Sequence, residues 1–235
     1  MRRLSSRHAQ RYTRQRGMSI VELMVGVAVG LLVTAAATMM VASQLADSRR
    51  LLLETQIQQD LRATADIIVR DLRRAGFWRD SHRGSAAGGA LEGMLSNVYG
   101  AVSTDADEDA VDEVTYAYAS PTAVEDNAIT SDERGGFRLS GGVIQTQIGA
   151  GNWQALTDGG TLRITQFTIT PRNQQIVLSC HRACSAGATP CPPQQTVRSL
   201  LIDIAGVAVS DATVLRSVRS YVRLRNDSIV GECRD

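Results

Sequence analysis

Lysine is missing from this sequence of 235 residues, and all 25 of its basic side chains are arginines. The absence excludes chemistry that needs a lysine amine, such as Schiff-base formation or the phosphate-binding lysine of a P-loop. Aromatic residues make up only 4% of the chain, which argues against a stacking surface for single-stranded nucleic acid. The sequence also lacks the motifs of common hydrolases, zinc proteases and nucleotide-binding enzymes. We therefore expect a protein that is not an enzyme and that holds no cofactor or metal.

Positive charge is concentrated at the N-terminus. Six of the arginines lie within the first 16 residues, where there is no acidic residue. The remainder of the chain has 19 arginines against 24 acidic residues and is net negative, although the whole chain carries a formal charge of +1. A nucleic-acid-binding protein would carry its basic patch on the folded domain, so we expect no nucleic acid partner.

A long apolar segment follows the basic one. Residues 23–46 contain no charged side chain, and Glu22 is the only one between Met18 and Ala46. An apolar helix of about 20 residues spans the roughly 30 Å hydrocarbon core of a bilayer, and a basic flank stays on the cytoplasmic side. The apolar run continues past Ala35–Ala37, which resembles a signal-peptidase site. We expect a single span of the inner membrane, with the chain after Ala46 in the periplasm.

Glu22 is the unusual residue of this segment, because a carboxylate inside an apolar layer is costly and marks a functional site by default. Two explanations are open. The carboxylate could lie near the helix start, reach the lipid headgroups and be favoured by the helix dipole. Alternatively, it pairs with a cation inside the apolar layer. Cleavage between Gly17 and Met18 would create such a cation at the α-amine of Met18, in the same chain or in a neighbouring copy.

The sequence R-G-M-S-I-V-E-L-M-V at residues 16–25 closely resembles the class III signal of type IV pilins and type II secretion pseudopilins. The resemblance implies that a prepilin peptidase cuts after Gly17 and methylates the new N-terminus at Met18, where the family usually has phenylalanine. It also implies that Glu22, the fifth residue of the mature chain, takes part in subunit assembly.

Two further segments, residues 70–78 (R-D-L-R-R-A-G-F-W) and 219–226 (R-S-Y-V-R-L-R-N), resemble parts of PilW-type minor pilins. This resemblance implies a minor type IV pilin in a pilus tip or initiation complex that supports pilus assembly, motility and adhesion. Its partners would be the prepilin peptidase, other minor and major pilins, the inner-membrane assembly platform and membrane lipid. After assembly it would belong to the pilus.

Two alternative functions remain open. The first is a J-type minor pseudopilin of a type II secretion system, which would share the N-terminal signal. The second is a signal-anchored periplasmic binding protein that keeps residues 1–17. A ligand pocket among Tyr116, Tyr118 and Trp153 is conceivable for this class, although we expect these aromatic side chains in the core.

The chain is expected to fold as a long helix followed by a β-rich domain. We divide it into a basic leader (1–17), a transmembrane or filament-core helix (18–46), an amphipathic continuation (47–76) and a β-rich periplasmic domain (77–235). Apolar residues recur every three or four positions from Leu53 to Ala75, which indicates one face of a helix. We therefore expect an α+β, pilin-like fold, with one helix from Met18 to Ala75 capped by Gly76. The helix is apolar all round in its first half, and its second half packs on a mostly antiparallel sheet.

Alternation of apolar and polar residues predicts the strands. They fall within residues 114–118, 137–139, 143–148, 162–170, 176–178, 200–209 and 213–225. Gly141-Gly142 indicates a hairpin turn, and Gly206 is expected to break its strand. In the last strand, Val214, Val218, Val222 and Leu224 should face the core. Arg219, Arg223 and Arg225 should face outward, and we favour a solvated face over a partner surface for them.

The four cysteines, Cys180, Cys184, Cys191 and Cys233, all lie near the C-terminus. An even number in an oxidising compartment indicates disulfides, and four cysteines allow three connectivities. We expect one pair to staple the insert at residues 180–193 and another to tie the C-terminal tail to it through Cys233. Four thiolates could instead bind zinc, but their spacing lacks the paired C-x₂-C knuckles.

An acidic run at Asp105–Asp109 resembles the start of a calcium-binding loop. It departs from the EF-hand pattern, because Ala110 stands at the sixth position and Tyr116 at the twelfth, where glycine and glutamate are required. We expect a solvated acidic loop there.

We predict that the mature protein in its native membrane begins at Met18 and carries one methyl group on the α-amine. Mass spectrometry of the N-terminal peptide measures both features, and another pilin processed in the same cells serves as the control. A retained leader in cells whose other pilins are processed would contradict the prediction and favour the anchored binding protein.

Overall fold

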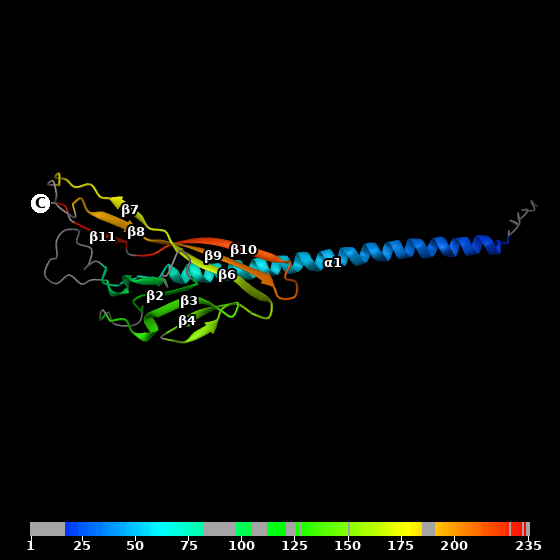
Figure 1. The fold of residues 1–235 in the computed structure, drawn as a ribbon, viewed down its shortest axis with the longest axis horizontal. Helices are drawn as coiled ribbons and strands as arrows, with labels where there is room; N and C mark the ends of the chain where they lie inside the picture. Colours follow the sequence, from blue (N-terminus) through cyan, green and yellow to red (C-terminus); the bar gives the residue numbers. More distant parts are fainter. Residues whose placement is uncertain are drawn as a thin grey trace, which may run out of the picture. The chain divides into compact units, whose positions relative to one another are not determined.

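The computed structural model describes residues 17–81, 97–104, 112–120, 126, 128–149, 151–184, 191–225, 227–231 and 233. The chain divides into two compact units, residues 1–49 and 50–235. The boundary between them falls within the first helix. The expected α+β architecture is confirmed, since one long helix is followed by antiparallel sheets (Figure 1).

Helix α1 comprises Ile20–Leu72 and is 53 residues long, slightly shorter at both ends than expected. After Leu72 the backbone tightens into a turn, in which the amide of Ala75 donates to the carbonyl of Leu72 at 3.0 Å. Gly76 follows with φ of +74°, which glycine adopts without strain. Its amide donates to the carbonyl of Ala117, so this glycine turns the chain away from the helix axis and toward the sheet.

The largest sheet contains five antiparallel strands in sequential order. They are β1 (Val102–Thr104), β2 (Glu113–Ala117), β3 (Arg134–Ser140), β4 (Val143–Ile148) and β5 (Trp153–Ala155). The 3-10 helices η1 (Val98–Gly100) and η2 (Ser131–Glu133) precede β1 and β3. Gly141 and Gly142 join β3 to β4 with φ of +61° and +79°, as the expected tight hairpin turn requires.

Two three-stranded antiparallel sheets complete the fold, so the single expected sheet is in fact three. One has the order β10-β9-β6, formed by Leu215–Arg223, Ser199–Ala208 and Leu162–Pro171. The other has the order β11-β8-β7, formed by Ser228–Val230, Gln194–Val197 and Gln174–Val177. Strands β1, β5, β8 and β11 were not predicted. Each has only three or four residues, and short strands give a weak alternating pattern; of the strands this short, only β7 was predicted.

One face of α1 forms the centre of the core. The predicted apolar positions Ile57, Leu61, Ala65, Ile68, Leu72 and Ala75 are each at most 1% exposed, and Leu53 is partly buried. They pack against buried side chains of the sheets, among them Phe137, Phe167 and Ile202. Full burial of each Leu or Ile contributes about 1.5–3 kcal/mol. The opposite face of the helix carries the exposed Arg62, Asp66 and Arg70, and the exposed Arg73 follows in the turn after it.

Gly206 does not break its strand, contrary to expectation. Strand β9 continues through Gly206, which pairs with Arg216 on one side and Ile164 on the other. A Cβ atom at this position would lie 2.7 Å from the Leu162 side chain, so glycine permits the close approach of β6. The irregularity falls on β6 instead, where the register shifts between Ile164 and Gln166.

The two faces of β10 agree with the alternation in the sequence. Val214, Val222 and Leu224 are buried, and Val218 is half-buried. Arg219, Arg223 and Arg225 are exposed, although Arg219 is paired with Asp203 of β9 at 2.5 Å. Arg216 bonds to Glu54 of α1 and so ties this edge strand to the helix.

Glu133 is a buried carboxylate, 4% exposed, that joins three segments. Its Oε1 accepts hydrogen bonds from the Ser120 amide at 2.9 Å and the Tyr99 hydroxyl at 3.2 Å, and its Oε2 accepts from the amide and hydroxyl of Thr130, both at 3.0 Å. Burial by itself would raise the pKa of this carboxyl, but the donors outweigh it and hold the pKa below the usual 4.5.

We predict that Glu133→Gln lowers the free energy of unfolding by about 1–3 kcal/mol at pH 7, because the amide nitrogen cannot accept the bonds that one carboxylate oxygen accepts. A group with a depressed folded-state pKa stabilises the fold above its unfolded-state pKa and loses that contribution as the pH falls. The wild-type protein should therefore lose stability below about pH 4.5, and the variant should lose less. Urea unfolding of both proteins between pH 3 and 7 tests this, and parallel pH profiles would contradict it.

Candidate functional site

The first part of α1 exposes apolar side chains on all sides. From Met18 to Leu45 its large apolar residues are 53–79% exposed, and the most apolar 18-residue window has no residue buried by the rest of the chain. This helix is long and apolar enough to cross a membrane. The exposed apolar surface far exceeds what a soluble monomer presents, so it needs lipid or other apolar chains around it.

The few polar side chains of this segment suit an apolar surrounding. The hydroxyl of Thr34 donates to the carbonyl of Gly30 at 2.9 Å, that of Thr38 to Ala35 at 2.8 Å, and that of Ser43 to Met40 at 2.9 Å. Each hydroxyl proton is therefore satisfied within the helix, which lowers the cost of placing the hydroxyl away from water.

Glu22 lies in the first turn of α1, where the positive end of the helix dipole favours a carboxylate. Its side chain is exposed, as are Gly17 and Met18 just before the helix. Among the described residues Glu22 forms no ion pair. A partner cation for Glu22 would thus come from lipid, from the N-terminus created by cleavage, or from another subunit.

The four cysteines form two disulfides, Cys180–Cys233 and Cys184–Cys191. The first closes a loop with a sequence separation of 53 and the second a loop with a separation of 7. The sulfur atoms of Cys180, Cys184 and Cys191 lie within 4.8 Å of one another. Because they are bonded in pairs, they offer no thiolate for the zinc site considered above. The acidic run at residues 105–109 lies outside the described residues.

The aromatic residues considered for a ligand pocket are only partly brought together. Tyr116 and Tyr118 line a cavity of about 550 Å³ between the end of α1 and the five-stranded sheet. Trp153 lies elsewhere, with the Arg138 guanidinium 4.3 Å from its ring centre. Burial, and next the nearby Asp71, raise the pKa of the Tyr116 hydroxyl, which therefore stays protonated. The pocket of three aromatic side chains suggested by the sequence is not formed.

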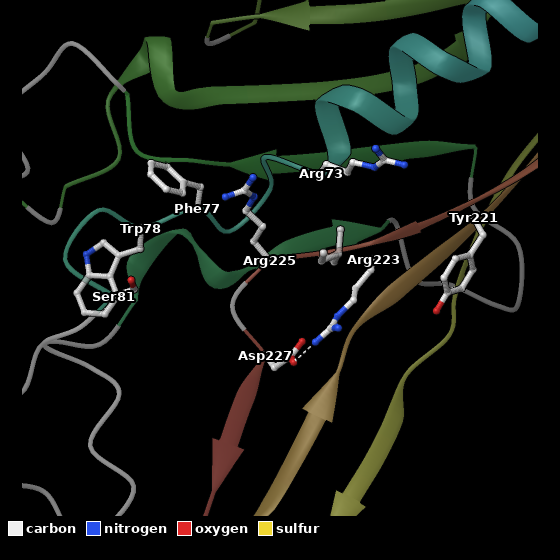
Figure 2. Close-up of a pocket in the computed structure, with 9 residues that line it drawn as sticks. Arg73, Phe77, Trp78, Ser81, Tyr221, Arg223, Arg225 and Asp227 are labelled. Atoms are coloured by element: carbon white, nitrogen blue, oxygen red, sulfur yellow. Dashed lines mark hydrogen bonds and ion pairs between the residues drawn. The ribbon is translucent and has the colours of Figure 1, made fainter.

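A second cavity, of about 660 Å³, lies between the residues that follow α1 and the end of strand β10 (Figure 2). It is lined by Arg73, Phe77, Trp78, Ser81, Tyr221, Arg223, Leu224, Arg225 and Asp227. No pattern in the sequence indicated this cavity. All its lining residues except Ser81 and Asp227 come from the two segments that resemble PilW-type pilins, but only the fold shows that those segments meet.

Comparison with known families gave two matches. The family of prepilin peptidase-dependent protein B matches residues 50–224, and the prokaryotic N-terminal methylation motif matches residues 12–38. The second match contains Gly17, Met18 and Glu22. No curated protein and no solved structure matched the chain.

We predict that the two disulfides stabilise the domain unequally. Removing Cys180–Cys233 by Cys180→Ser with Cys233→Ser should cost about 2 kcal/mol more than removing Cys184–Cys191 by the corresponding double substitution. The reason is that the longer loop restricts the unfolded chain more. Urea unfolding of the purified full chain in detergent measures the difference. Equal destabilisation by the two double variants would contradict the loop-length argument.

Proposed function

The chain belongs to the family of prepilin peptidase-dependent protein B, and from this membership we propose that it is a PilW-type minor type IV pilin. It carries the N-terminal methylation motif, so it is a protein of the pilin and pseudopilin type. In the proposed role it is a structural component, not a catalyst, of a pilus tip or initiation complex.

The proposal rests on one observation: the two parts of α1 require different surroundings. Its second part is amphipathic and buries one face against the sheets of its own domain. Its first part is apolar and remains uncovered by any described residue of the chain. Such a segment can lie in lipid as a monomer and among equally apolar helices in a filament. Moving between the two costs little hydrophobic free energy, because both surroundings are apolar.

Processing makes this exchange possible. The arginine-rich leader holds the precursor with its N-terminus in the cytoplasm. Cleavage after Gly17 removes six arginines in a single step and leaves the amine of Met18 at the start of the helix. The segment that remains between Met18 and Ala46 has one charged side chain, that of Glu22, so extraction from the bilayer no longer carries a strongly basic peptide with it.

Glu22 then sets the register between subunits. In an apolar filament core, a carboxylate and an ammonium attract each other more strongly than in water. Breaking such a pair leaves a buried charge and costs several kcal/mol. A subunit that enters one turn too high or too low would leave Glu22 without the amine of its neighbour's Met18. Pairing therefore rejects wrong registers, and the exposed side chain of Glu22 is accessible to such a partner.

The domain after α1 is placed in the periplasm before assembly and on the pilus afterwards. There it would contact other minor and major pilins, while the apolar segment contacts lipid, the prepilin peptidase and the inner-membrane assembly platform. Two disulfides support this placement, because such bonds persist in oxidising compartments. A J-type pseudopilin of a type II secretion system is the second candidate, since the same N-terminal signal serves both machines.

We predict that Glu22→Ala leaves membrane insertion intact and abolishes or strongly reduces assembly of surface pili. Asp66→Ala is the matched control, because Asp66 is an exposed acid on the same helix beyond the apolar segment. Membrane fractionation and counting of surface pili by electron microscopy measure the two effects. Normal piliation by Glu22→Ala would refute the pairing argument.

In a deletion strain, loss of twitching motility supports the pilus, whereas loss of protein secretion supports the J-type alternative.

A further inference from the structure

The cavity at the end of α1 is lined by three arginines and by aromatic side chains, of which Tyr221 is exposed (Figure 2). Arg73 is contributed by the turn after the helix, and Arg223 and Arg225 by the end of β10 and the residues after it. All three side chains are exposed. Among the described residues that line the cavity, Asp227 is the only acidic one. These residues together carry a net positive charge, in a domain whose composition is net negative.

Two of the three arginines have no anionic partner among the described residues. Arg223 is paired with Asp227 at 2.5 Å, the contact drawn in Figure 2. Among the described residues, no carboxylate pairs with Arg73 or Arg225. The Arg225 guanidinium lies 5.8 Å from the centre of the Phe77 ring, a contact that orients it but leaves its N–H donors available.

Asp227 is already engaged within the domain. Its Oδ2 accepts from Arg223 and from Gln195 at 2.7 Å. Its Oδ1 is buried and closed to solvent, so it does not face a ligand in the cavity. The negative charge of Asp227 therefore acts on Arg223 and on the nearby Arg198.

The aromatic residues provide the remaining surface. Tyr221 is 59% exposed on the outer face of β10, Phe77 is half-buried, and the buried Leu224 also lines the cavity. A compact anion would use the arginines but would leave this apolar surface unused. An extended ligand with acidic and apolar groups uses both.

We propose that this cavity binds an acidic peptide segment of a neighbouring pilin-type subunit. Carboxylates of the segment bond to Arg73 and Arg225, and side-chain methylenes pack on Phe77 and Tyr221. Arginine suits this role, because its planar guanidinium group can bind a carboxylate through two parallel hydrogen bonds. The inference rests on the proposed function only in naming the partner as another subunit.

The chain itself provides a probe of the required chemistry. Residues 103–113, S-T-D-A-D-E-D-A-V-D-E, are acidic and contain no basic residue. A fluorescent peptide of this sequence, titrated with the detergent-solubilised full chain, reports binding through its anisotropy. We expect saturable binding that weakens as salt screens the charges. We also expect loss of binding by a peptide in which every Asp and Glu is replaced by Asn and Gln.

The double variant Arg73→Gln with Arg225→Gln should weaken peptide binding by roughly tenfold or more, as expected for two exposed charged contacts. Arg219→Gln is the matched control. It removes an exposed arginine of β10 that does not line the cavity, and it should change the affinity less than twofold. Circular dichroism and thermal unfolding establish that the variants are folded, and the neutral peptide tests the charge requirement without altering the protein.

Three results would overturn the proposal: no binding by the wild-type chain, equal binding by the double variant, or equal binding of the neutral peptide. Displacement of the peptide by inorganic phosphate as effectively as by unlabelled peptide would also overturn it, because a single anion would then suffice. None of these results bears on processing after Gly17 or on Glu22, which the peptide assay does not involve. Failure of this inference is therefore distinguishable from failure of the proposed function.

Discussion

Burial of one face of α1 is the interaction on which the rest of the domain depends. Six side chains between Ile57 and Ala75 are almost completely removed from water, and strands from two of the sheets contribute residues to the same cluster. Without the helix, these sheets would expose their inner faces, because no other described helix is long enough to cover them. The aromatic content is low, so aliphatic residues at helical spacing provide most of the apolar contact.

The first part of α1 follows the opposite principle. It has no polar face and no cover from the described chain, yet its hydroxyls are satisfied by helix carbonyls. A helix of this kind is stable wherever the surroundings are apolar, and its hydrophobic free energy is similar among acyl chains and among other apolar helices. A single carboxylate at its start is then enough to distinguish one arrangement of neighbours from another.

Arginine provides the cation of each side-chain ion pair found among the described residues of this lysine-free chain. Arg216 connects β10 to Glu54 of α1, Arg79 donates to the carbonyl of Ser120 at 2.7 Å, and Arg198 donates to the carbonyl of Gly100. The planar guanidinium can bridge two segments while its stem packs on apolar surface. Arg73 and Arg225 of the cavity at the end of α1 differ from these arginines, because no carboxylate in the described part of the chain pairs with them.

The sequence by itself determined the features that depend on local order. The apolar run, the position of Glu22 after Gly17, the helical stripe of α1 and the hairpin at Gly141-Gly142 all follow from spacing along the chain. Tertiary structure decided what depends on distant segments. It divided the strands into three sheets, and it paired Cys180 with Cys233. It also kept β9 continuous through Gly206, because β6 needs the space that a side chain would fill. Likewise, it brought Arg73 to Arg225 across a sequence separation too long for any local pattern to register.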